Sequence, residues 1–301
     1  MTQEKITRDI INFLKNNDLY ISDNGINQEV ISVSNINATT KQSLAWTSKN
    51  KIVVEKLNCG ILIVPEEFTE NSNQISIIKV TNPRIAFALI GNYFFIDQKE
   101  DYKISDFAVI DKNIILNDTV SIGHNSILEG DIRIGNYVKI KNNVSIIGKV
   151  TIGNNVVIKS GSVIGDDGFG YFKENATSSW EKFPHFSGVT IGNNVDIGSN
   201  VCIDRGGLSD TIIEDNVKID NLCHIAYNVS VGNGSVITAN TTISGSVIIG
   251  KNVWIAPNSV IRDKLQVKDN ALIGIGSVVT KNVLANTTVF GVPAKFLKSN
   301  D

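Results

Sequence analysis

Branched aliphatic residues return at every sixth position over most of the last two thirds of the chain. One row of these residues runs over positions 122–164, a short row over 191–203, and a third over 213–279. A period of six fits neither the 3.6-residue period of an amphipathic helix nor the alternation of a hairpin sheet. The pattern indicates short strands joined by tight corners, with the large aliphatic side chains stacked inside.

This repeat is typical of the hexapeptide class of parallel β-helix, in which three hexads make one triangular coil. We therefore predict a mainly β fold with a left-handed parallel β-helix over residues 106–285. A small or β-branched residue stands two positions before nearly every large aliphatic. Cys223 is one of them, and we expect it to face inward as a packing residue rather than a nucleophile. Flat walls suit the side-by-side packing of three columns, so a homotrimer is the expected assembly.

Residues 1–105 do not keep the six-residue period. An amphipathic start is followed by short apolar runs bounded by turn residues, IVVEKLNCGILIVP and ISIIKV, and the segment after Pro83 has helical spacing. These features predict a small α/β domain before the β-helix. The last residues, 286–301, are predicted to form a C-terminal tail.

The chain is close to neutral, with 28 basic and 30 acidic residues, which argues against nucleic acid as a partner. Its three cysteines are scattered and contain no CxxC pair, which argues against disulfides and a cysteine zinc site. The charged, helix-like start differs from a secretory signal, and no segment stays apolar long enough to span a bilayer. We expect a cytoplasmic protein with no membrane span.

Two insertions break the repeat, and a binding site is expected where they leave the column. The larger insertion, residues 166–188, is rich in glycine and aromatic residues. It carries His185, which we expect on a protruding loop that reaches the site of a neighbouring subunit. The smaller insertion, RGGLSD at 205–210, directly follows Asp204.

The motifs around these insertions carry a resemblance. SLAW and NPRIAFALI in the first domain, then GDDGFGY, CIDRGGLSDT and KIDNLCHIAYNVSVG in the coils, make the chain similar to the UDP-3-O-acylglucosamine N-acyltransferases of lipid A synthesis. The resemblance covers most of the chain and implies a trimeric enzyme that moves an acyl group from a thioester to the amine of a nucleotide-linked sugar. It also implies that the domain of residues 1–105 binds the nucleotide, with Trp46 stacked on a uracil or thymine base.

Two features depart from that family. Its catalytic base is a histidine in an IAHN segment, and Tyr227 stands at the matching position here; a tyrosine hydroxyl, with a pKa of about 10, is a poor base at pH 7. The chain also ends at GVPAKFLKSND rather than in the family's helical extension associated with the acyl carrier protein, and this ending is similar to hexapeptide acetyltransferases that use acyl-CoA. We therefore expect transfer of a short acyl group from acyl-CoA to a dTDP- or UDP-linked amino deoxysugar for surface polysaccharide synthesis.

The predicted reaction is direct attack of the sugar amine on the thioester. This attack needs an oriented amine, a donor for the oxyanion and an acceptor for the amine proton. Asp204, His224 and Tyr227 are predicted to orient the amine, with His224 or water accepting the proton. His224 precedes an inward isoleucine and so points outward from the wall. Further contacts with the sugar nucleotide are expected from His185, Phe169, Tyr171 and Asn228.

Coenzyme A is expected to lie along the later coils as the acyl-donating co-substrate, without a metal. Its pantetheine arm is predicted to pack on the small residues Ala256, Gly274 and Gly276. Lys281 and Lys295 are predicted to meet its phosphates as mobile point charges.

Other interpretations of the sequence stay open at this point. The chain could be a lipid A enzyme that uses an acyl carrier protein, or a catalytically degenerate scaffold that only binds a sugar nucleotide. A γ-type carbonic anhydrase needs three histidines converging on zinc, and His124 and His224 are too far apart along the predicted column for this. His224 and Tyr227 could also be wall residues with structural contacts alone.

Overall fold

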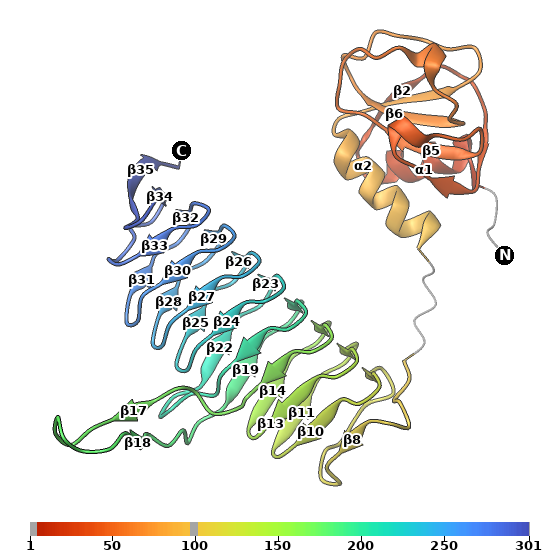
Figure 1. The fold of residues 1–301 in the computed structure, drawn as a ribbon. Helices are drawn as coiled ribbons and strands as arrows, with labels where there is room; N and C mark the ends of the chain where they lie inside the picture. The colour runs from red at the N-terminus through yellow and green to blue at the C-terminus, as the bar shows by residue number, and fades with distance from the viewer. Residues whose placement is uncertain (1–4, 97–101, 301) are drawn as a thin grey trace. The chain divides into compact units, whose positions relative to one another are not determined.

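The computed structural model describes residues 5–96 and 102–300, and the chain divides into two compact units after residue 100 (Figure 1). The loss of the six-residue period predicts this boundary near residue 105. No helix of the described residues has the length and apolar character needed to cross a membrane.

The first unit contains a five-stranded sheet in the order β2-β7-β6-β5-β4, in which β2 alone is antiparallel to its neighbour. Ile61 and Ile63 of the central strand β6 pack in one core with α1 and α2, whereas Leu62 and Val64 belong to a second core on the opposite face. The elements of this unit are β1 (Lys5–Ile6), α1 (Thr7–Asn16), β2 (Tyr20–Asp23), β3 (Glu29–Val30), β4 (Ser32–Val33), η1 (Ile36–Ala38), β5 (Ser43–Trp46), η2 (Val54–Lys56), β6 (Ile61–Pro65), β7 (Ser76–Val80), α2 (Pro83–Ile90) and η3 (Gly91–Phe95).

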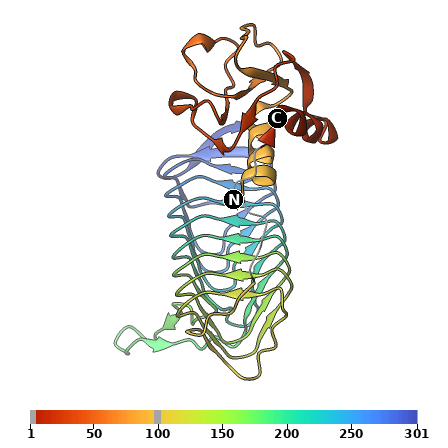
Figure 2. The same ribbon diagram turned by 90° about the vertical axis from the view of Figure 1, so that its right-hand side faces the viewer.

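The second unit is a left-handed parallel β-helix with three walls (Figures 1 and 2). The first wall consists of β8 (Val109–Ile110), β10 (Ile127–Glu129), β13 (Ser145–Ile147), β16 (Val163–Ile164), β21 (Cys202–Ile203), β24 (His224–Ile225), β27 (Thr242–Ile243), β30 (Val260–Ile261) and β33 (Val278–Val279). The second wall consists of β11 (Ile132–Ile134), β14 (Val150–Ile152), β19 (Val189–Ile191), β22 (Thr211–Ile213), β25 (Ser230–Val231), β28 (Ile248–Ile249) and β31 (Gln266–Val267). The third wall consists of β9 (Ser121–Ile122), β12 (Lys139–Ile140), β15 (Val157–Ile158), β20 (Asp196–Ile197), β23 (Lys218–Ile219), β26 (Val236–Ile237), β29 (Trp254–Ile255), β32 (Leu272–Ile273), β34 (Thr287–Phe290) and β35 (Lys295–Ser299).

The six-residue period is the burial pattern of this column. Ile164, Ile203, Ile225 and Ile243 pair directly across successive strands of the first wall, and each is at most 1% exposed. The register therefore passes through both insertions unchanged, because a slip would move the aliphatic ladder out of the core. Cys223 is also buried, as its inward position predicts.

Asparagine occupies most of the corners that need a left-handed backbone. Asn155, Asn194 and Asn252, among others, have φ between 53° and 56°. This conformation costs most residues free energy, but asparagine tolerates it better than other side-chain-bearing residues. The corners explain why the apolar rows are separated by Asn and Gly along the sequence.

The larger insertion forms a two-stranded hairpin that projects from the column (Figures 1 and 2). Its strands, β17 (Tyr171–Phe172) and β18 (Glu181–Lys182), pair in an antiparallel manner.

Strand pairing continues beyond residue 285, in the segment predicted to be a tail. β34 pairs in parallel with β32, and β35 folds back as its antiparallel partner. The end of the chain up to Ser299 is therefore part of the third wall.

Candidate active site

The base of the projecting hairpin folds back onto the coil that contains HIAYN. His185 lies edge-on against Tyr227, with their ring centroids 5.1 Å apart and an interplanar angle of 73°. Only 8% of His185 is exposed. The sequence predicts this histidine on a protruding loop, but it lies in the buried base of the insertion, against its own chain.

Glycines make room for both rings. A Cβ atom on Gly168 would come within 2.8 Å of His185 Nε2, and one on Gly170 within 3.1 Å of His185 Cε1. On the far side, a Cβ atom on Gly245 would come within 2.8 Å of Tyr227 Cζ. The packed pair therefore needs backbone without side chains on both sides.

The imidazole of His185 is uncharged near neutral pH. Burial lowers its pKa, and the nearby Asp167 carboxylate offsets only part of this effect. Its Nδ1 atom is buried and, within the described residues, has no hydrogen-bond partner. A buried polar atom without a partner costs about 1–3 kcal/mol, so such an atom calls for an explanation.

Asp210 fastens the end of the insertion to the second wall. Its carboxylate accepts hydrogen bonds from the Ser187 hydroxyl, the Gly188 N–H at 2.8 Å and the Thr190 hydroxyl at 3.1 Å. These bonds, that of Ser187 first, hold the pKa of Asp210 below its usual range. An ionised carboxylate thus anchors the chain just after His185.

A second anchor holds the beginning of the insertion. The Arg205 guanidinium donates from Nε to the Gly165 carbonyl at 2.8 Å and lies 3.3 Å from Asp167. Asp167 also pairs with Lys182 of β18. The hydrogen bond from Lys182, more than the charge of Arg205, lowers the pKa of Asp167.

Between the hairpin and the corners of the β-helix lies a hollow of about 280 Å³. It is lined by Tyr171, Phe183, His185, Gly207, Tyr227 and Asn228, among others. The Asn228 side chain accepts a hydrogen bond from the Gly207 N–H at 2.7 Å. Of the predicted sugar contacts, His185, Tyr171 and Asn228 therefore meet Tyr227 in one place, and Asn228 also holds the RGGLSD corner.

Asp204 and His224 lie next to each other, with 3.8 Å between Asp204 Oδ2 and His224 Nε2. An ion pair would lower the pKa of the aspartate and raise that of the histidine. The opposite shifts occur, because burial and then the charge of Asp166 raise the pKa of Asp204 to about 7, and burial lowers the pKa of His224. The two groups therefore do not form a fixed ion pair at neutral pH, and neither lines the hollow.

The projecting hairpin carries an exposed aromatic surface. Phe169 and Tyr171 are 4.9 Å apart between centroids, and with Trp180 they line a second, open hollow of about 590 Å³. Phe169 is 84% exposed and Trp180 66%. Phe169 therefore faces solvent here rather than the hollow beside Tyr227.

Trp46 belongs to the first unit, at the end of β5. Its ring is half-buried and lies 6.1 Å from that of Phe87 in α2. The ring packs against the core formed with both helices. Only the exposed part of the indole could stack on a nucleotide base, as predicted for Trp46.

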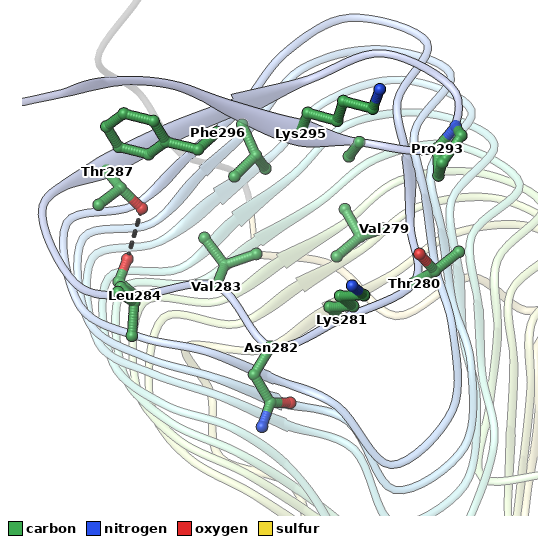
Figure 3. Close-up of a pocket in the computed structure, with 12 residues that line it drawn as sticks. Val279, Thr280, Lys281, Asn282, Val283, Leu284, Thr287, Pro293, Lys295 and Phe296 are labelled. Atoms are coloured by element: carbon green, nitrogen blue, oxygen red, sulfur yellow. Dashed lines mark hydrogen bonds between the residues drawn. The ribbon is translucent and has the colours of Figure 1, made fainter.

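The residues predicted to bind the donor lie near the C-terminal end of the β-helix. Lys281 and Lys295 line a hollow of about 400 Å³ with apolar side chains such as Val279 and Phe296 (Figure 3). The Phe290 ring covers Gly274, because a Cβ atom there would lie 2.4 Å from the ring. Pantetheine cannot pack on Gly274 as predicted unless this ring moves.

Gly276, in contrast, has no atom within 4 Å of the position of an added Cβ atom, and Ala256 is half-buried. Within residues 5–96 and 102–300, no group of three or more His, Cys, Asp or Glu side chains could hold a metal ion.

Residues 131–166 and 210–245 match the family model "Bacterial transferase hexapeptide (six repeats)". These segments lie in the β-helix on either side of the larger insertion. The chain is a hexapeptide-repeat protein.

Several curated relatives of this hexapeptide-repeat protein carry one name, UDP-3-O-acylglucosamine N-acyltransferase. The protein of that name from Saccharophagus degradans is 59% identical over 124 residues, which cover 41% of this chain and 36% of the relative. UDP-3-O-acylglucosamine N-acyltransferase 2 from Legionella pneumophila is 43% identical over 230 residues, which cover 70% of this chain and 66% of the relative. The matched stretch thus spans between about a third and two thirds of these relatives.

Solved structures of LpxA are also similar to this hexapeptide-repeat protein. LpxA from Acinetobacter baumannii has a TM-score of 0.59 at 25% identity, covering 65% of this chain and 74% of that one. UDP-N-acetylglucosamine O-acyltransferase (LpxA) from Moraxella catarrhalis has a TM-score of 0.58 at 26% identity, covering 66% and 75%.

Several residues that shape the hexapeptide-repeat site were not singled out from the sequence. Arg205 and Asp210 belong to the RGGLSD insertion, whose position was noted but whose contacts were not predicted. In the sequence, Phe183 is one aromatic residue of a loop and Gly245 one glycine at a corner, and neither motif indicates a site. The six-residue period could have indicated Gly245, since it stands one coil, or 18 residues, after Tyr227.

Proposed function

We propose that this hexapeptide-repeat protein is an N-acyltransferase that joins an acyl group to the amine of a UDP-linked amino sugar. Identity with proteins named UDP-3-O-acylglucosamine N-acyltransferase, 59% over 124 residues and 43% over 230 residues, carries this proposal. The similarity to LpxA structures supports an acyl transfer to a UDP-sugar on the same kind of column. These relatives favour a lipid A type acceptor over the dTDP-linked deoxysugar expected from the end of the sequence.

The aromatic surface of the hairpin supports an acceptor that already carries an acyl chain. Phe169, Tyr171 and Trp180 line an open hollow of about 590 Å³. Burying an acyl chain against such side chains is favourable by roughly 25 cal/mol per Å² of apolar surface. A 3-O-acylated UDP-glucosamine therefore fits this part of the molecule better than an unacylated deoxysugar.

The reaction needs few groups from the protein. The amine attacks the thioester carbonyl, the carbonyl oxygen takes up negative charge, and the amine loses a proton. His185 and His224 both have pKa values lowered by burial, so each is largely a free base at pH 7. Tyr227 can donate its hydroxyl hydrogen to the sugar or to the intermediate, but it does not need to act as a base.

A thiol-release assay tests this proposal. Wild-type protein is given UDP-3-O-acylglucosamine, UDP-glucosamine or dTDP-linked amino sugars, with either acyl carrier protein thioesters or acyl-CoA of several chain lengths as donor. Release of thiol with UDP-3-O-acylglucosamine supports the proposal, and the better donor identifies the carrier.

Two other results have clear meanings. Turnover with dTDP-linked amino sugars and acyl-CoA alone contradicts the lipid A type acceptor and returns the function to a surface polysaccharide. Binding of UDP-sugars without turnover by any donor indicates a scaffold that has lost its catalytic activity.

A further inference from the structure

We infer that His185 accepts the proton of the substrate amine, through Nε2. This inference rests on the proposed function, and it concerns which side chain of the chain performs the proton transfer. It starts from the one buried imidazole that faces the hollow beside Tyr227.

The ring of His185 packs against aromatic side chains. Tyr227 contacts it edge-on at 5.1 Å, and Phe183 is 6.5 Å away at an interplanar angle of 89°. Its Nδ1 is buried and, among the described residues, unpartnered. Histidines that serve only the fold usually bond their ring nitrogens to protein groups. The ring of His185 differs, because packing fixes its position while its Nδ1 has no partner among the described residues.

Near Nε2, glycine backbone rather than side chains approaches the ring of His185. Gly168 and Gly170 approach it with backbone alone, since a side chain on either would come within 2.8 Å or 3.1 Å of the ring. Gly170 and His185 both line the hollow of about 280 Å³. A small nucleophile such as a sugar amine therefore has space next to the imidazole.

The charges around His185 suit a base that is neutral before the reaction and charged afterwards. Burial, Lys182 and Arg205 lower its pKa, whereas Asp167 and the Phe183 backbone raise it. Burial dominates, so the free ring is neutral. Once the ring takes a proton, the Asp167 carboxylate stabilises the imidazolium.

The step balances without a further reactant. The amine nitrogen bonds to the thioester carbon, the carbonyl electron pair moves to oxygen, and a proton passes from nitrogen to His185 Nε2. The tetrahedral intermediate then collapses, the C–S bond breaks, and the leaving thiolate takes the proton back from the imidazolium. The products are an amide and a thiol, and the imidazole is neutral again.

His224 is the competing base, and the structure gives it a different place. Its side chain is 42% exposed and stands beside Asp204. It does not line the hollow that holds His185 and Tyr227. His224 therefore serves as the comparison in the experiment.

The test measures kcat, KM and the pH profile of kcat/KM for wild type, His185→Gln, His224→Gln and His124→Gln, with the best pair of substrates from the thiol-release assay. His124 is a matched control, because it lies several coils earlier and contacts Ser105 and Phe107. We expect His185→Gln to lower kcat by at least about 100-fold, as for loss of a general base, with KM little changed. Its profile should lose the acidic limb that wild type and His124→Gln keep.

Other outcomes decide against the inference. If wild type turns over and His185→Gln keeps its rate and its acidic limb, the inference fails while the proposed function stands. Loss of the limb in His224→Gln alone transfers the role to His224. Tyr227→Phe is measured in the same way, and its collapse beside a normal His185→Gln transfers the role to Tyr227. An inert wild type overturns both the proposed function and the inference.

A titration separates loss of a base from loss of the fold. The chain has three histidines, so the ring Hε1 resonances can be assigned by NMR from the three glutamine variants, whose remaining signals also report folding. We expect the resonance assigned to His185 to titrate at a lower pH than a free histidine and to shift when UDP-glucosamine is added. A resonance that ignores UDP-glucosamine contradicts contact with the amine.

Discussion

At the scale of single residues, Asp204 has an ionisation that opposes folding. Its pKa rises from 3.8 to about 7, chiefly through burial, and its side chain is 14% exposed. The folded state therefore holds the proton of Asp204 over a pH range in which the unfolded chain has lost it. In that range stability falls as the pH rises.

This predicts a pH-dependent gain from Asp204→Asn. The difference in free energy of unfolding between the variant and wild type should grow by about 2–4 kcal/mol as the pH rises from about 4 to about 7. Above about pH 7 the difference should stay constant. Urea unfolding at several pH values measures the difference, with Asp118→Asn at an exposed position as the control for loss of one carboxylate. A difference that stays constant or shrinks with rising pH contradicts the buried, protonated Asp204.

Gly245 is a second residue whose role can be measured. An alanine there would place its Cβ 2.8 Å from Tyr227 Cζ, and the ring has His185 on another side. We expect Gly245→Ala to destabilise the protein by about 1–3 kcal/mol, as overpacking does. Thermal or urea unfolding checks this.

A double-mutant cycle isolates the clash. In a Tyr227→Ala background the cost of Gly245→Ala should largely disappear, because the ring is absent. Gly207→Ala is the matched control, since the nearest atom to its added Cβ is 3.7 Å away. An equal cost in both backgrounds would show that Gly245 is needed for its backbone and not for Tyr227.

The residues of the site were predicted only in part, for a physical reason. Asp204 and His224 adjoin Ile203 and Ile225, where the aliphatic pattern holds on either side of the smaller insertion, so the sequence places them on successive coils. The contact between His185 and Tyr227 has no such source, since it depends on how an aperiodic insertion folds back. The lack of a partner for His185 Nδ1 among the described residues is likewise a result of packing. The pattern of residues along the sequence could not predict it.

At the scale of elements, the corners are where the coils need a left-handed backbone. Asn155 has a φ of 56°, is exposed, and its side chain makes no hydrogen bond to the described residues. Its contribution is therefore that of an asparagine in a left-handed backbone. We expect Asn155→Ala to lower the free energy of unfolding by about 1–2 kcal/mol and Asn155→Gly to leave it nearly unchanged.

Urea denaturation of the three proteins measures this, with the slope of the transition as a check that the unfolded state is the same. An alanine variant as stable as wild type would mean that the corner relaxes out of the left-handed region.

The β-helix itself could be predicted almost completely, because the large aliphatic residue of each hexad is the buried one. Ile203, Ile225 and Ile243 follow the period and pair as expected. The continuation through β34 and β35 was missed because Thr287 and Val289 depart from the period, so the pairing of β34 with β32 is a tertiary feature.

At the scale of the whole molecule, the outward side chains of the second wall bear on assembly. Ile212 and Ile248 stand on either side of Ser230 across neighbouring strands, and they are 37% and 49% exposed. Two partly exposed isoleucines on one flat wall are suited to burial between copies of the chain. We therefore expect the second wall to form the interface of the homotrimer predicted from the sequence.

We therefore expect light scattering after size exclusion to give three times the 32.7 kDa mass of the chain. Ile248→Arg should shift the protein toward the monomer, because a charge would be buried in the interface without a partner. Ile275→Arg changes an isoleucine that is 59% exposed at a corner and should leave the mass unchanged. A monomeric wild type rules out the trimer. A trimer that survives Ile248→Arg but not Ile275→Arg places the interface at the corners, so Ile212 and Ile248 would have to serve another contact.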